Sequence, residues 1–122
     1  MTIMTLKIEL PEFDKFYELS ENIKKKSLEL SLVDLDISKQ QAEIAKRAMV
    51  DTSLYVKGKP PSMEYLKNTL FVTGIDDELL SLLGKKETLE AELDYLKRQY
   101  EILKIITEIW RTQSANERSA LI

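Results

Sequence analysis

The chain has 122 residues, of which 43% are apolar and 32% are charged, and its net charge at pH 7 is −3. This length suits one domain, and the apolar content excludes wholesale disorder. With only three glycines and few aromatic residues (7%), the sequence does not suit an all-β sandwich, whose many turns need turn residues, so we predict a single all-α domain over residues 1–122.

Cysteine and histidine are both absent. Their absence excludes disulfides, thiolate chemistry, imidazole catalysis and the usual zinc ligands, so we expect no cofactor, no metal site and no enzyme. A chain without cysteine fits a reducing cytoplasm. No apolar run approaches the roughly 20 residues that span a bilayer, and the N-terminus lacks the basic leader of a signal peptide. We therefore expect a cytoplasmic protein with no membrane partner.

The first part of the chain predicts a long helix. Residues 5–10, TLKIEL, alternate polar and apolar side chains, which favours a short strand or an extended lead-in. Pro11 suits a first helical turn, and no strong breaker follows before Lys57, so we predict a helical arm over 11–57. The alternation in SLELSL, residues 27–32, is also compatible with a strand, although Leu and Glu favour a helix.

Two apolar stripes run along this predicted arm. One recurs at three and four residues and consists of Leu28, Leu32, Leu35, Ala42, Met49 and Val56. The other recurs every seven residues and consists of Ile23, Leu30, Ile37 and Ile44. Two stripes indicate a helix that contacts more than one neighbour.

Residues 58–75 are predicted to break the helix near the middle of the chain. Gly58 can adopt the left-handed conformation that ends a helix, and the Pro60–Pro61 pair prevents an immediate restart. Ser62 can cap a short helix over 63–71, which Gly74 would close. The break would let a second helical arm fold back along the first.

The second arm is predicted over 76–112, followed by a polar tail, 113–122, that frays. Asp76, Asp77 and Glu78 suit the positive end of a helix. Three carboxylates can also bind magnesium, but acids at a helix start act far more often as caps, so we predict no metal here.

A heptad repeat follows the second arm. With Leu79 at position a, position d is apolar throughout. A monomer of this size would expose too much apolar surface along this face, so we predict a homo-oligomer built through this helix, with Trp110 largely buried. The residues expected at the contact are Leu79, Leu82, Leu89, Leu93, Leu96, Tyr100, Leu103 and Trp110.

Residues 46–67 carry five basic and two acidic side chains, a net charge of +3 in an acidic protein. Cations that follow a phosphate backbone, beside aromatic rings on which bases stack, are what sequence-independent binding of single strands requires. Solvated lysines around a loop would produce the same pattern. The candidate nucleic-acid-binding residues are Lys46, Arg47, Tyr55, Lys57, Lys59, Tyr65 and Lys67.

The order of these parts resembles a known family. KGKPPS in the break, LK soon after, DDELLSL and then YEILKIITEIW follow the layout of the phage recombination mediator UvsY family over residues 40–110. The resemblance implies a small, helical, non-enzymatic, ring-forming protein that binds single-stranded DNA. It further implies that the protein helps to load a recombinase onto strands covered by single-strand binding protein, in the host cytoplasm if a phage encodes it.

The resemblance also implies DNA contacts at Lys57, Lys59 and Lys67, and assembly through the C-terminal helix. The chain departs from the family's pattern in being acidic overall, with a net charge of −3. The alternative is a structural or adaptor coiled coil, such as a phage assembly, scaffolding or tail-associated component, with no nucleic-acid role. It accounts for the heptads equally well.

Overall fold

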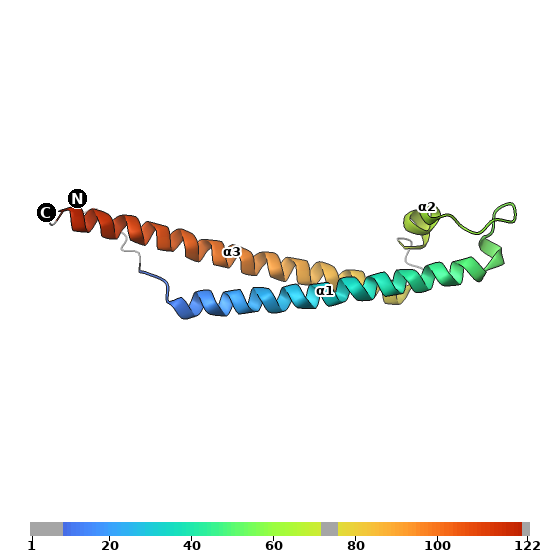
Figure 1. Ribbon diagram of the computed structural model, residues 1–122, viewed down its shortest axis with the longest axis horizontal. Helices are drawn as coiled ribbons and strands as arrows, with labels where there is room; N and C mark the ends of the chain where they lie inside the picture. The colour runs from blue at the N-terminus through green and yellow to red at the C-terminus, as the bar shows by residue number, and fades with distance from the viewer. Residues whose placement is uncertain (1–8, 72–75, 121–122) are drawn as a thin grey trace. The chain divides into compact units, whose positions relative to one another are not determined.

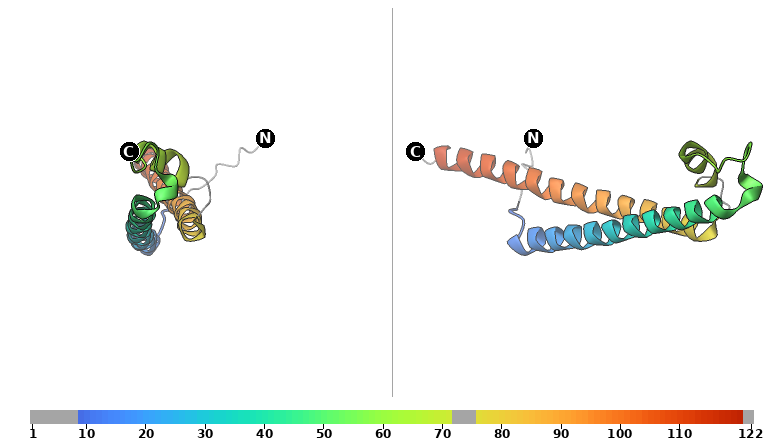
Figure 2. Two further views of the ribbon diagram at one scale, coloured as in Figure 1. Left: turned by 90° about the vertical axis from the view of Figure 1, so that its right-hand side faces the viewer. Right: turned by 45° about the vertical axis from the view of Figure 1, so that its right-hand side comes forward.

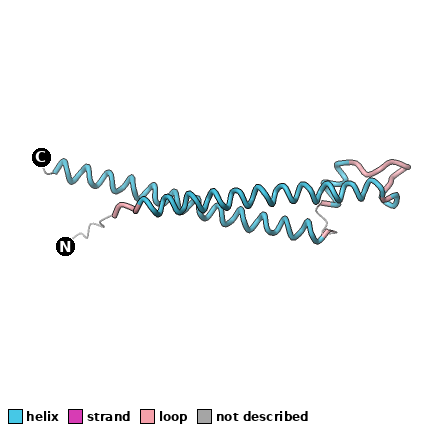
Figure 3. The backbone as a smooth tube through the Cα atoms, turned by 60° about the horizontal axis from the view of Figure 1, so that its bottom comes forward, coloured by secondary structure: helices cyan, strands magenta, loops and turns pink. Residues whose placement is uncertain are grey.

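The structure, a computed structural model, describes residues 9–71 and 76–120. Of the described residues, 86% are helical, and two long helices, α1 (Phe13–Val50) and α3 (Asp77–Ala120), pack against each other (Figure 1). The described residues contain no strand (Figure 3), so the predicted all-α class is confirmed. Most of the predicted lead-in over 5–10 lies outside the described residues, and SLELSL is helical.

Three short elements lie between the long helices. A 3₁₀ turn, η1 (Thr52–Leu54), follows α1, and a single helical turn, α2 (Met63–Tyr65), continues directly into a π-helical segment, η2 (Leu66–Leu70). The backbone N–H of Phe71 donates to the Leu66 carbonyl at 3.0 Å, which closes the wider π turn.

The chain forms two compact units, and α1 and α3 each contribute to both. One unit is Ser27–Ala91, and its core joins α1, η2 and α3. The inward residues are Val33, Ile37, Ile44, Ala48, Leu66, Leu70, Leu79 and Leu89. The short α2–η2 segment lies beside the end of α1 (Figure 2), and Leu66 there is only 1% exposed. Of the two predicted stripes on α1, the seven-residue repeat therefore supplies the core.

The other unit pairs the start of α1 with α3 from Glu92 onward. The rings of Phe16 and Tyr100 meet edge to face with centroids 5.6 Å apart. Lys26 Nζ lies 2.8 Å from a carboxylate oxygen of Glu92. Trp110 is partly buried within the single chain. Its burial was predicted for a homo-oligomer, so that prediction stays untested.

The first arm ends at Val50 and not at residue 57. Asp51 accounts for this end, because its carboxylate accepts hydrogen bonds from the backbone N–H of Ser53 at 3.1 Å and from the Ser53 hydroxyl at 2.6 Å. Such a local side-chain bond offers the backbone an alternative to another helical turn. Gly58 therefore does not cap α1; it belongs to a separate turn further along the chain.

The capping predictions for Ser62 and for the start of the second arm are confirmed. Ser62 Oγ accepts from the Tyr65 N–H at 3.2 Å, and Asp76 accepts from the Leu79 N–H at 2.8 Å. Gly74 lies outside the described residues. The predicted tail over 113–122 is helical as far as Ala120, because Gln, Ala, Glu and Arg are adequate helix formers.

Candidate nucleic-acid interface

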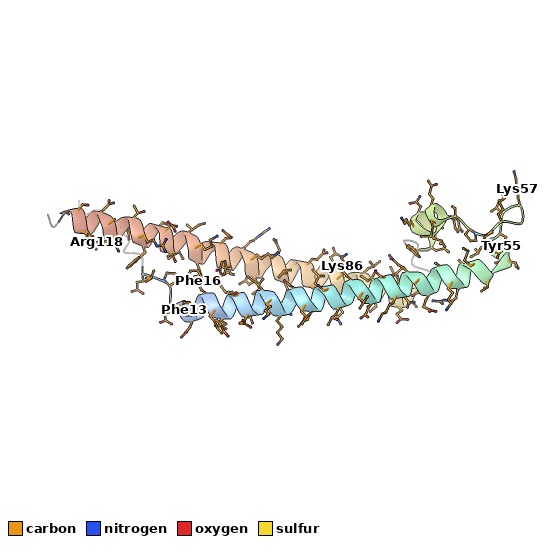
Figure 4. The ribbon with its side chains drawn as sticks, in the orientation of Figure 1. Phe13, Phe16, Tyr55, Lys57, Lys86 and Arg118 are labelled. Carbon is orange, nitrogen blue, oxygen red and sulfur yellow. The ribbon has the colours of Figure 1, made fainter. Side chains whose placement is uncertain are left out.

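A tight turn presents the basic stretch after α1. Val56 and Lys59 exchange two backbone hydrogen bonds, both 3.0 Å long, across Lys57 and Gly58. Both central residues have positive φ, 54° for Lys57 and 75° for Gly58, as a two-residue hairpin turn requires. Figure 4 shows Lys57 at the tip of this turn. The turn thus places Lys57 at its tip, and both Lys57 and Lys59 are exposed.

An open hollow of about 570 Å³ lies beside this turn. Tyr55, Lys59 and Tyr65 all line it, so the structure brings two predicted aromatic residues and one predicted lysine together. Pro60 and Pro61 form part of its wall, and none of the lining residues is acidic. The hollow therefore offers flat apolar surface next to a positive charge.

The two aromatic rings are held in different ways. The Tyr55 hydroxyl donates a hydrogen bond to the Met49 carbonyl, which ties the ring to the last turn of α1 and leaves it half-buried. Tyr65 is 41% exposed and sits on α2, whose first turn is fixed by the Ser62 cap. The Tyr55 ring is thus held by its own hydroxyl, whereas the cap fixes only the backbone from which the Tyr65 side chain projects.

The lysines of the turn carry uncompensated charge. Within the described residues, neither Lys57 nor Lys59 forms an ion pair, and both are exposed. The nearest acid before them in sequence, Asp51, is already engaged by Ser53. These ammonium groups are therefore free to meet an anion.

Arg47 was predicted to bind nucleic acid together with the lysines, but it does not line the hollow beside the turn. Its guanidinium lies 3.1 Å from a carboxylate oxygen of Asp76, which also accepts from Gln40 Nε2 at 3.0 Å. The N–H of Leu79 and these two side chains lower the pKa of Asp76 below its usual range. Arg47 therefore supports the start of α3.

The remaining predicted basic residues lie outside the hollow. Lys46 is exposed on α1 and Lys67 is exposed on η2, and neither lines the hollow. A second, smaller hollow of about 160 Å³ is lined by Arg47, Asp51 and Asp76 together with apolar side chains. Its charged groups already bond to one another or to local backbone, which makes it a poorer anion site.

The residues predicted at an oligomer contact face inward within the chain. Leu79 and Leu89 belong to the core of the Ser27–Ala91 unit, and Leu82 packs against it. In the other unit Leu93 is buried, and the remaining members, Leu96, Tyr100, Leu103 and Trp110, are half-buried. The heptad positions predicted for a contact between copies therefore lie on the inward face of α3 within each unit. Whether copies associate through it stays a prediction.

Acidic side chains do not gather into a metal site in the part of the chain that the structure describes. Asp76 caps α3, while Asp77 and Glu78 are exposed. Sequence reasoning treated Pro60 and Pro61 only as breakers and did not place them in the wall of the hollow. Two prolines between two tyrosines were the available signal, because a proline ring is apolar and proline has no backbone N–H to donate.

No described helix is both long enough and apolar enough to cross a membrane. Neither a protein-family model, a curated protein nor a solved structure matches the chain.

Proposed function

We propose that this protein is a non-enzymatic, single-stranded-DNA-binding protein that contacts DNA through the hollow beside the Lys57–Gly58 turn. The observation that carries this proposal is the convergence of Tyr55, Tyr65 and Lys59 on one hollow without an acidic neighbour in its lining. Bases stack on aromatic faces irrespective of sequence, and ammonium groups follow the phosphates.

The backbone conformation of Lys57 supports the proposal. Its φ of 54° is a left-handed conformation that costs a residue with a Cβ roughly 1–2 kcal/mol. Asparagine or glycine would occupy this position at lower cost. A lysine at the tip of the turn therefore destabilises the fold slightly. A contact between its ammonium group and an anion would explain why lysine stands there.

The test is binding of a fluorescein-labelled oligothymidine, measured by anisotropy at low and moderate salt. Tyr55→Ala and Tyr65→Ala should each weaken binding roughly tenfold, since a stacked base contributes about 1–3 kcal/mol. Lys57→Gln with Lys59→Gln should flatten the dependence of log K on log salt, by about 0.7 for each phosphate that the variant no longer neutralises. Lys67→Gln should have a smaller effect, because Lys67 does not line the hollow.

Matched controls come from α3. Tyr95 is 62% exposed and Lys97 is exposed, so Tyr95→Ala and Lys97→Gln remove the same chemical groups elsewhere. Tyr55→Phe keeps the ring and removes only the bond to Met49. An equal loss of affinity in the control variants, or no binding by the wild-type protein at low salt, would overturn the proposal.

The resemblance to the UvsY family extends this proposal to loading a recombinase onto strands covered by single-strand binding protein. The wild-type protein should then stimulate a recombinase on such strands, and the Lys57→Gln/Lys59→Gln variant should stimulate it less. If DNA binding is observed without stimulation, the binding function stands and the mediator role fails.

The alternative, a structural or adaptor coiled coil, is favoured by one observation. Leu28, Leu32 and Leu35 on α1 are all more than half exposed, at 62%, 54% and 51%, which is unusual unless another helix covers them. If the wild-type protein does not bind oligothymidine at low salt, the structural or adaptor coiled coil replaces DNA binding as the proposed function.

A further inference from the structure

The apolar side chains of α1 lie on two opposite faces. At 100° per residue, Leu28 and Leu35 point roughly opposite to Ile37 and Ile44. Ile37 and Ile44 are buried in the core of the Ser27–Ala91 unit. The opposite face, here called the outer stripe, consists of Leu28, Leu32, Leu35, Ala42 and Met49.

The outer stripe is exposed along its full length. Leu28 is 62% exposed and Met49 is 50% exposed, with Leu32 and Leu35 between these values. The steps from one member to the next are four, three, seven and seven residues, which is the spacing of coiled-coil core positions. From Leu28 to Met49 the stripe covers three heptads, about 32 Å of helix, which is enough for a helix–helix contact.

Charged residues on and beside the stripe are balanced. Lys39 and Lys46 occupy the two core positions of this repeat that are not apolar, and Asp36 and Glu43 follow along one edge. None of these four side chains forms an ion pair among the residues that the structure describes. The stripe thus carries two cations and two anions without ion-pair partners in the described part of the chain.

We propose that the outer stripe of α1 binds a second copy of this chain. A face with equal numbers of opposite charges is complementary to itself, because the lysines of one copy can reach the carboxylates of the other. A nucleic acid would not suit this face, since its charges cancel and its leucines offer no stacking surface. The inference is independent of the DNA-binding proposal.

The first test compares two matched double variants of the full-length protein by sedimentation velocity at micromolar concentrations. Leu28→Asp/Leu35→Asp alters the outer stripe, and Ile102→Asp/Ile105→Asp alters similarly exposed residues of α3, which are 47% and 57% exposed. The wild-type protein should sediment as a dimer or larger species. The stripe variant should associate at least tenfold more weakly, whereas the α3 variant should keep the wild-type mass.

Circular dichroism shows whether each variant retains its helices. A wild-type monomer, a stripe variant with unchanged mass, or an α3 variant that dissociates equally would overturn the proposal. In the case of a wild-type monomer, the stripe would instead be a site for a different protein.

The second test exchanges the charges. Lys39→Glu/Lys46→Glu makes the face acidic, and Asp36→Lys/Glu43→Lys makes it basic, so each variant alone should associate more weakly than the wild type. Mixing the two should restore association to within a few-fold of the wild type, because each face then meets its opposite. The absence of restoration in the mixture, with both variants folded, would also overturn the proposal.

Discussion

Asp76 is the residue that joins the start of α3 to the side of α1. Its carboxylate accepts hydrogen bonds from the Leu79 N–H at 2.8 Å, Gln40 at 3.0 Å and Arg47 at 3.1 Å. The first of these satisfies a backbone donor that a helix start leaves unpaired. The other two come from α1. One carboxylate therefore caps a helix and fixes its position against a neighbour.

The stabilisation by Asp76 should depend on pH. The Leu79 N–H, and then Gln40 and Arg47, lower the pKa of Asp76 in the folded chain, so the ionised form stabilises the fold. This contribution is present above the pKa of the unfolded chain and is lost as pH falls through the lower folded pKa. Asp76→Asn should therefore lower the thermal midpoint at pH 7, and the difference from wild type should shrink as the medium becomes acidic.

Thermal unfolding followed by circular dichroism at a series of pH values measures this effect. Asp77→Asn is the matched control, because Asp77 is adjacent and exposed and has no described hydrogen bond across to α1. A stability difference between wild type and Asp76→Asn that stays constant down to strongly acidic pH would contradict the assignment.

The turn after α1 depends on two consecutive residues in left-handed conformations. Gly58 meets this need without cost, and nothing lies within 4 Å of the position where a Cβ would stand. A side chain at residue 58 would thus fit sterically and still strain the backbone. Lys57 already carries such a strain, which the turn tolerates because the two Val56–Lys59 hydrogen bonds hold it.

Gly58→Ala should open the turn without unfolding the helices. The left-handed conformation costs alanine roughly 1–2 kcal/mol, so the amide protons of Val56 and Lys59 should exchange with solvent about 5- to 30-fold faster. Lys57→Asn is the control, because asparagine tolerates this conformation and should leave the exchange rates equal or lower. Unchanged exchange in Gly58→Ala would show that the turn does not depend on residue 58.

At the scale of the whole molecule, most stabilisation comes from helix packing within each unit. The α2–η2 segment is short but contributes to stability, because its Leu66 and Leu70 side chains pack in the core with residues of α1 and α3. Leu66 is the most buried residue described, at 1% exposure. The break in the chain is therefore part of the packed structure as well as a connection.

Leu66→Ala should lower the free energy of unfolding by about 2–5 kcal/mol, as buried leucine truncations do. Met63→Ala is the control, since Met63 lies in the same short segment and is 60% exposed. It should change stability by no more than about 0.5 kcal/mol. Urea unfolding of the full-length chain measures both, and similar losses of stability in the two variants would contradict the packing of η2.

Local signals in the sequence were sufficient to predict the two long helices and the caps at Ser62 and Asp76, although not every helix end. The heptad positions from Leu79 to Trp110 identify the inward face of α3, and Ser62 and Asp76 cap as predicted. These features depend on spacing along one helix and on neighbours within a few residues, so the sequence contains them directly. The early end of α1 was missed because the Asp51–Ser53 bonds compete with the helix over a similarly short range.

Periodicity alone could not decide which apolar stripe of α1 is buried, because both stripes have helical spacing. Packing against α3 and η2 selects Ile37 and Ile44 and leaves Leu28 and Leu35 exposed. The sequence also could not show which basic residues have an acidic partner. In the structure Arg47 pairs with Asp76, whereas Lys59 lines the hollow. Contacts between residues distant in sequence decide these points, and only the folded chain brings such residues together.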